Sequence, residues 1–156
     1  MGGVNSTSDL TLSPGGGFLL EPTGSARILT PEMLSDEQRM MGQAAEEFVR
    51  GEVLPRSDAL ERQEADLLPG LMRQAGQLGL LAVDVPPEYD GLGGELTTSA
   101  LIAERMAPQA SFAVTFGAHT GIATLPIVFF GTPEQKKRYL PRLASGEWVA
   151  AYALSE

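Results

Sequence analysis

One long stretch of the sequence carries no formal charge, and it limits the folds open to this chain more than any other feature. It runs from Met106 to Thr132, and its one titratable side chain is His119. At this length a transmembrane helix has to be considered. Threonines, glycines and Pro126 interrupt the apolar residues, which makes the stretch too polar for a lone span. We therefore expect a helix that is buried among other helices and kinked at Pro126.

Helical spacing of apolar residues and two capping boxes predict an all-α fold. Ser35 with Gln38, and Thr132 with Gln135, each pair a capping hydroxyl with a side chain that reaches back to the cap. Helices are predicted near residues 36–54, 68–78, 97–107, 112–130 and 133–145.

Prolines and glycines mark where these helices stop. Pro55 cannot continue the first helix, and Gly79 suits the end of the second. Residues 80–94 are rich in both residue types and predict a structured loop. Residues 148–154 are the first strand-like run, and no partner strand is visible in the sequence. We therefore expect the chain, which stops at Glu156, to be a piece of something longer.

Composition divides the chain and excludes several classes of function. Residues 1–30 are predicted to form a flexible tail, 31–146 a helical domain, and 147–156 the first strand of a truncated β domain. The first 26 residues contain no Lys or Arg, unlike a secretory or mitochondrial leader, so we expect a cytoplasmic protein. The absence of cysteine excludes disulfides and thiolate metal sites. The net charge of −9 disfavours nucleic acid as a partner.

Two short motifs are interpreted as ordinary structure. Residues 91–94 read G-L-G-G, but no Lys-Ser or Lys-Thr pair follows, so a turn is favoured over a phosphate loop. Residues 136–138 are basic, and beside the net negative charge they are interpreted as a solvated helix face.

A polar stripe in the uncharged stretch has two interpretations that residue chemistry leaves open. Thr115 and His119, and Thr120 and Thr124, are four residues apart and place small polar groups along one side of an apolar helix. They form either a packing seam with hydroxyls bonded to the backbone or the wall of a narrow slot.

Three motifs in order resemble the acyl-CoA dehydrogenase family. Residues 78–94 look like the loop after the third helix of that family. Residues 131–141 read G-T-P-E-Q-K-K-R-Y-L-P and resemble its G-T-x-E-Q-K-x-x-Y-L-P signature. Residues 146–156 are similar to the strand that follows. Residues 15–21 and 111–120 resemble the very-long-chain branch and its bacterial relatives.

The resemblance implies an FAD-dependent enzyme that oxidises acyl-CoA thioesters to trans-2-enoyl-CoA in fatty-acid β-oxidation. This chain would hold the N-terminal helical domain and the opening strand of the next domain. A glutamate base normally lies in the C-terminal helical bundle of the family. No catalytic residue and no metal ligand is therefore assigned here, and the fragment is expected to be inactive.

The resemblance also carries over two groups of binding residues. The positions that match the strand beside the flavin ring are Tyr152, Leu154 and Ser155. The positions that align with the helix wall of the acyl slot are Thr115, Ala118, His119 and Ile122. The histidine departs from the medium-chain pattern, which leaves the preferred acyl length open.

The implied partners are acyl-CoA, an electron-transfer flavoprotein or similar acceptor, and further copies of the full-length chain. A peripheral membrane contact stays open. The alternative to the enzyme is a non-catalytic helical interaction module, or an acyl-chain-binding domain without redox chemistry.

Overall fold

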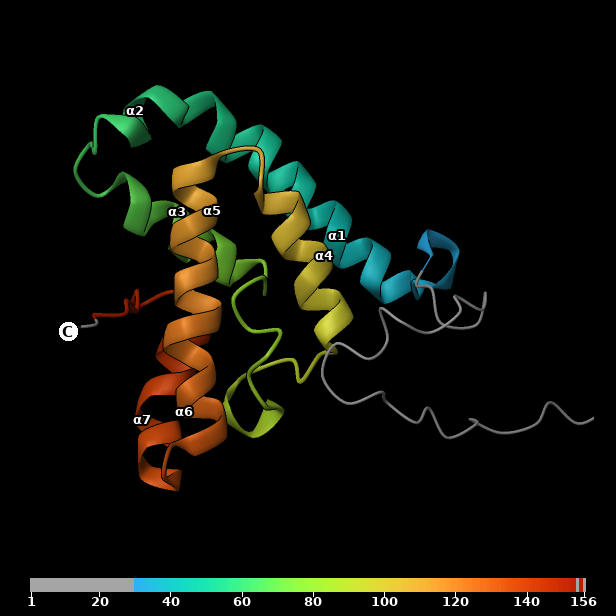
Figure 1. The fold of residues 1–156 in the computed structure, drawn as a ribbon, viewed down its shortest axis with the longest axis vertical. Coiled ribbons are helices and arrows are strands. Elements are labelled where there is room, and N and C mark those ends of the chain that lie inside the picture. Colours follow the sequence, from blue (N-terminus) through green and yellow to red (C-terminus); the bar gives the residue numbers. More distant parts are fainter. Residues whose placement is uncertain (1–29, 154, 156) are drawn as a thin grey trace, which may run out of the picture. The chain divides into compact units, whose positions relative to one another are not determined.

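The computed structural model describes residues 30–153 and 155, and its secondary structure there is entirely helical (Figure 1). The chain divides into two compact units, Met1–Leu34 and Ser35–Glu156. In the first unit, the described residues form one 3-10 turn, η3 (Pro31–Met33). The predicted tail lies outside the described residues except for Thr30.

The second unit is a series of helices joined by short turns. All five predicted helical segments are present, and both capping boxes are formed, at Ser35 and Thr132. The elements are α1 (Asp36–Phe48), the π-helical η4 (Val49–Val53), the 3-10 turn η5 (Leu54–Arg56), α2 (Ser57–Glu61), α3 (Leu67–Gln77), the 3-10 turn η6 (Pro87–Tyr89), α4 (Leu96–Met106), α5 (Ala110–Gly117), the π-helical η7 (Ala118–Thr124), α6 (Leu125–Phe130) and α7 (Pro133–Ala144).

The expectation that Pro55 ends the first helix is wrong. The backbone continues through η4 and η5 into α2, and Pro55 lies in the first turn of η5. The Leu54 N–H donates to the Val49 carbonyl, a bond that spans five residues and not four. This wider π turn accommodates a residue that has no N–H and whose ring would clash within a regular α-helix.

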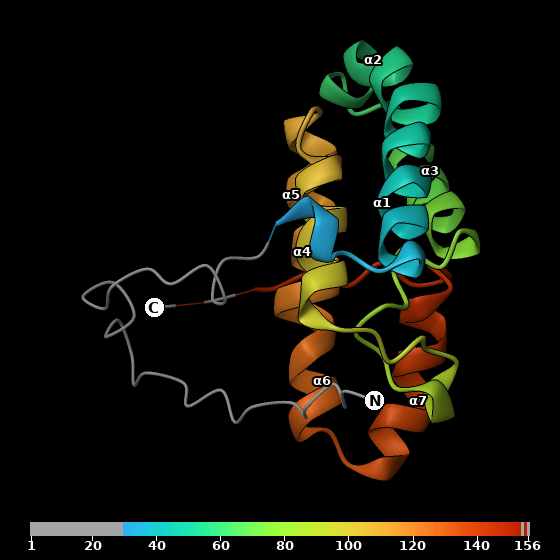
Figure 2. The same cartoon turned by 90° about the vertical axis from the view of Figure 1, so that its right-hand side faces the viewer.

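The core lies where α1, α3, α4 and α5 meet. Helix α1 packs along α4, and α4 in turn packs against α5 (Figure 2). Phe48, Met72, Ile102, Met106 and Phe112 are among the buried residues that join these helices. The rings of Phe48 and Phe112 are 5.8 Å apart, so α1 and α5 meet through aromatic contact.

The long uncharged helix forms as predicted but is not buried as predicted. Residues Ala110–Phe130 are continuous through α5, η7 and α6, and they are long and apolar enough to cross a membrane by length and composition. Of the 18 most apolar consecutive residues in this helix, only 22% are buried. Neighbouring helices cover Phe112, Phe116, His119 and Thr124, while the exposed apolar side chains are Val114, Ile122, Phe129 and Phe130. The burial expectation is wrong because a single face of this helix has partners among the described residues.

The predicted strand near the C-terminus does not form. Residues 149–153 have no regular secondary structure, and Leu154 lies outside the described residues. A strand is defined by hydrogen bonds to a neighbouring strand, and the described part of this chain offers none. The all-α class holds without this last element.

Candidate functional site

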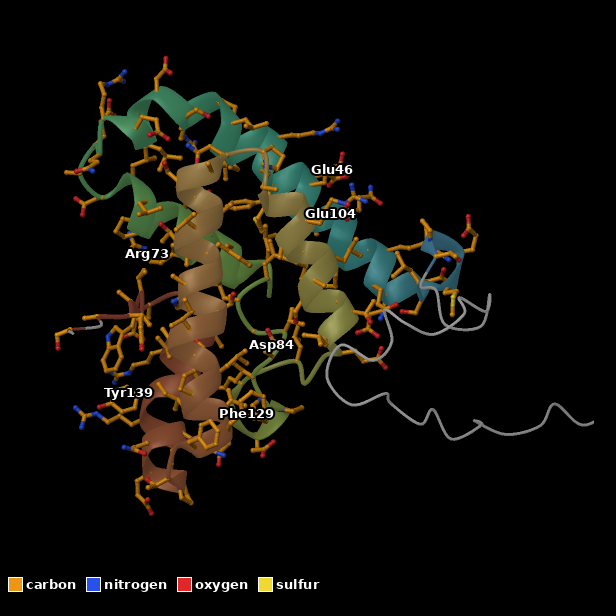
Figure 3. The ribbon with its side chains drawn as sticks, viewed as in Figure 1. Glu46, Arg73, Asp84, Glu104, Phe129 and Tyr139 are labelled. Carbon is orange, nitrogen blue, oxygen red and sulfur yellow. The ribbon has the colours of Figure 1, made fainter. Side chains whose placement is uncertain are left out.

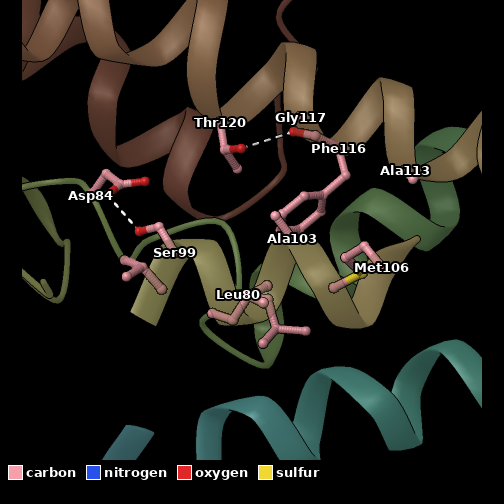
Figure 4. A pocket seen from close by; sticks show the side chains of 11 residues that line it. Leu80, Asp84, Ser99, Ala103, Met106, Ala113, Phe116, Gly117 and Thr120 are labelled. Atoms are coloured by element: carbon pink, nitrogen blue, oxygen red, sulfur yellow. Dashed lines mark hydrogen bonds between the residues drawn. The ribbon is translucent and has the colours of Figure 1, made fainter. Parts of the chain in front are cut away.

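A cavity of about 70 Å³ lies between the loop after α3, helix α4 and helix α5 (Figure 4). Its walls are apolar over most of their extent. Ile102, Ala103 and Met106 of α4 face Ala113 and Phe116 of α5 across it. This small space suits an apolar group better than a charged one.

A polar pair lies at one end of this cavity. The Ser99 hydroxyl donates to Asp84 Oδ1 at 2.6 Å, and both side chains line the space (Figure 4). Asp84 is the one ionisable residue in the lining. Sequence analysis missed this pair. The three- and four-residue spacing of Ser99, Ile102, Ala103 and Met106 places these residues on one face of α4, and this spacing could have predicted that Ser99 lines the cavity.

The four residues predicted to line an acyl slot are not brought to one cavity. Thr115 borders an open groove beside Glu61 and Asp66. Ala118 is half-buried and Ile122 is 53% exposed, whereas His119 is fully buried. None of the four lines the cavity between α4 and α5.

The hydroxyls of the polar stripe are bonded to the backbone of their own helix. Thr115 donates to the Ser111 carbonyl at 3.0 Å, and Thr120 donates to the Phe116 carbonyl at 3.0 Å. Thr124 donates to the His119 carbonyl at 2.6 Å. This is the arrangement of the packing-seam interpretation. Thr120 also lines the cavity, so that position combines both roles.

Both ring nitrogens of His119 are engaged by the backbone. Nε2 lies 3.0 Å from the Leu143 carbonyl oxygen, and Nδ1 lies 3.1 Å from the Ala150 backbone nitrogen. A carbonyl can only accept and an N–H can only donate, so the ring is neutral and carries its proton on Nε2. Burial lowers the pKa of His119, although the bond to the Leu143 carbonyl opposes this shift.

Stability is therefore expected to fall when the pH drops below 6.5, the ordinary pKa of histidine. In the unfolded chain His119 takes up a proton there, while the folded chain keeps the ring neutral, so acid favours unfolding. The slope from one such group reaches about 1.4 kcal/mol per pH unit between the folded pKa and 6.5. Urea unfolding at several pH values should show this slope in the wild type but not in His119→Asn, which has no titrating ring. Equal slopes in the two proteins would contradict the neutral buried ring.

The flavin-side residues lie at the free end of the chain. Tyr152 is 59% exposed, and Ser155 is also exposed. Neither side chain has a hydrogen-bond partner among the described residues. Leu154, the third predicted residue, lies outside them.

The two weak motifs have the structural roles expected of them. The N–H groups of Leu92, Gly93 and Gly94 donate to the carbonyls of Ala82, Val85 and Val83, so these amides are not free to cradle a phosphate. Lys137 and Arg138 are exposed on α7, as expected for a solvated face. No group of three metal-ligating side chains occurs among the residues that the structure describes.

Comparison with known proteins matches the helical unit to one family. Residues 35–147 match the family model "Acyl-CoA dehydrogenase, N-terminal domain". The chain belongs to the acyl-CoA dehydrogenase family.

Relatives of this acyl-CoA dehydrogenase domain are much longer proteins. A probable acyl-CoA dehydrogenase of Bacillus subtilis is 49% identical over 91% of this chain and 24% of its own length. The very long-chain specific acyl-CoA dehydrogenase of Mus musculus is 38% identical over 81% of this chain and 20% of its own length. A crystal structure of an acyl-CoA dehydrogenase complexed with FAD from Bacillus anthracis is 50% identical with a TM-score of 0.85, covering 91% of this chain and 25% of that one. The chain thus spans about a quarter of these relatives.

Proposed function

We propose that the chain is the N-terminal domain of a longer FAD-dependent enzyme that oxidises acyl-CoA thioesters to trans-2-enoyl-CoA. The observation that carries this proposal is the family match over residues 35–147 in a chain that spans about a quarter of its relatives. The domain supplies walls for binding, because its cavity is apolar and its one ionisable lining residue, Asp84, is bonded to Ser99. A long- or very-long-chain substrate is supported by the similarity to the mouse enzyme.

We propose that the C-terminal segment contacts one polar edge of a flavin. Tyr152 and Ser155 are exposed, and their hydroxyls can donate or accept hydrogen bonds. In the whole enzyme they would hold the FAD ring together with Leu154. When bound, FAD supplies the acceptor for a hydride from C3 of the acyl chain. The residues of this chain would orient the FAD ring and the acyl chain and exclude water. They would not remove the proton from C2.

Exposed apolar side chains on the long helix support contacts with further protein. Val114 is 72% exposed and Phe130 is 87% exposed, and Figure 3 shows Phe129 at the surface of α6. Burying such side chains stabilises an assembly through the hydrophobic effect. We propose that other domains of the same enzyme, or further copies of it, cover this face, and that an electron-transfer flavoprotein or similar protein accepts the electrons.

The test of the acyl slot is Ala118→Leu in the longer enzyme. Ala118 is half-buried and Ile122 is exposed, so both reach the surface of the long helix, where an acyl chain could pass. An added isobutyl-sized group there should obstruct long chains more than short ones. We expect kcat/KM to fall about tenfold or more for long acyl-CoA and much less for short acyl-CoA.

Ala110→Leu is the matched control, because it adds the same group at an exposed position of the same helix. It should leave the chain-length profile unchanged. An equal loss across all chain lengths for Ala118→Leu would identify the position as a packing contact. Absence of acyl-CoA oxidation by the longer protein would overturn the proposed function itself.

A further inference from the structure

Four contacts hold the chain between the end of α7 and Ala150. The Trp148 N–H donates to the Arg142 carbonyl at 3.1 Å, and the Arg142 guanidinium lies 4.4 Å from the centre of the Trp148 ring. Tyr139, labelled in Figure 3, places its ring 6.0 Å from that of Trp148. The Ala150 N–H then donates to His119 Nδ1.

Ala150 is the last anchored residue before the segment predicted to meet the flavin. Residues 151–153 and 155 are exposed and form no hydrogen bond with other described residues. Tyr152 is only two residues beyond Ala150. The direction in which Tyr152 leaves the helical unit therefore depends on the bond between Ala150 and His119.

The π-helical turn η7 places His119 where it can make this bond. Thr124, five residues later, is also buried, and its hydroxyl donates to the His119 carbonyl. A π turn has hydrogen bonds that span five residues, and such turns often occur at functional positions. Ile122, between them, remains exposed.

We propose that His119 is a positioning residue for the flavin-side segment. Its Nε2–H tautomer holds the end of α7 through Leu143 and the exit segment through Ala150. One buried ring thereby sets where the chain leaves the helical unit before Tyr152 and Ser155, beside the helix that carries Ala118 and Ile122. The inference rests on the proposed function, since that function gives Tyr152 and Ser155 their place beside the flavin.

Two matched variants separate the two hydrogen bonds. In His119→Asn the amide oxygen takes the place of Nδ1, so the acceptor for Ala150 remains while the donor to Leu143 is lost. In His119→Gln the amide nitrogen takes the place of Nε2, so the donor to Leu143 remains while the acceptor for Ala150 is lost. Each variant loses one buried bond, and both are expected to unfold at similarly lowered temperatures.

The experiment compares hydrogen exchange at the Ala150 amide in the 156-residue chain with FAD binding by the longer protein. In His119→Gln we expect the Ala150 amide to exchange about tenfold faster than in the wild type and FAD to bind about tenfold more weakly, with an altered visible spectrum of the bound flavin. His119→Asn should resemble the wild type in each measurement. Nitrogen NMR of the wild-type ring should show the proton on Nε2, which requires no variant to fold.

Three outcomes separate this inference from the proposed function. Equal exchange at Ala150 in both variants, or a ring protonated on Nδ1, would overturn the positioning role whether or not FAD binds. If the two variants differ in exchange at Ala150 but have similar FAD binding and spectra, the bond between Ala150 and His119 has only a structural role. That result would also overturn the positioning role. A longer protein that binds no FAD at all would overturn the proposed function. The exchange difference would then show only that His119 holds Ala150 in place.

Discussion

The 156-residue chain by itself is expected to show no turnover of acyl-CoA and no stoichiometric binding of FAD. Dehydrogenation requires a base at C2, a hydride acceptor at C3 and a polarised thioester, all in contact at once. In the proposed enzyme, this chain would contribute only one edge of a flavin platform, at Tyr152 and Ser155. The residues of a composite site act as a unit, so a part of such a site loses far more than a proportional share of catalysis.

The measurement is reduction of a dye acceptor with acyl-CoA and added FAD, together with the flavin content of the purified chain. A protein extended through the C-terminal bundle serves as the positive control and should be yellow and active. Turnover by the 156-residue chain would overturn the assignment of the base to that bundle and the proposal that this chain is one part of a larger enzyme.

Gly76→Ala is expected to destabilise the fold by roughly 3 kcal/mol, the upper range for overpacking. A methyl group at this position in α3 would overlap the backbone carbonyl of Ser145 and lie 2.9 Å from the Gly146 nitrogen. Both neighbours are backbone atoms at the end of α7, so no side chain can turn away to relieve the clash. The close approach of α3 and α7 therefore requires glycine.

Gly70→Ala is the matched control within the same helix. An added methyl group there meets nothing within 4 Å, and alanine favours a helix over glycine, so a gain of roughly 0.5–1 kcal/mol is expected. Urea unfolding of the two variants measures both effects. A loss below about 1 kcal/mol in Gly76→Ala would mean that the end of α7 can move away from α3 at little cost.

Local signals in the sequence determined where most helices begin and end. The capping boxes at Ser35 and Thr132 formed as predicted, because each joins residues only three positions apart. Gly79, which follows the C-cap residue Leu78 of α3, adopts φ of 75°, as expected for a glycine that ends a helix. The family resemblance, carried by contiguous motifs in the loop and in α7, was confirmed for the same reason: the information lies in neighbouring residues.

The tertiary structure alone decided which way side chains face and which of them meet. Four-residue spacing placed His119 and Thr115 along one side of a helix, but it did not show that His119 lies in the π turn η7 and contacts Leu143 and Ala150. The Asp84–Ser99 hydrogen bond at the cavity joins a loop to a helix across fifteen residues, which no local pattern specifies. Pro55 was misjudged because the wide turn of η4 absorbs it. For His119 and Asp84 the deciding contacts join segments distant in sequence, and residue order does not display how such segments pack.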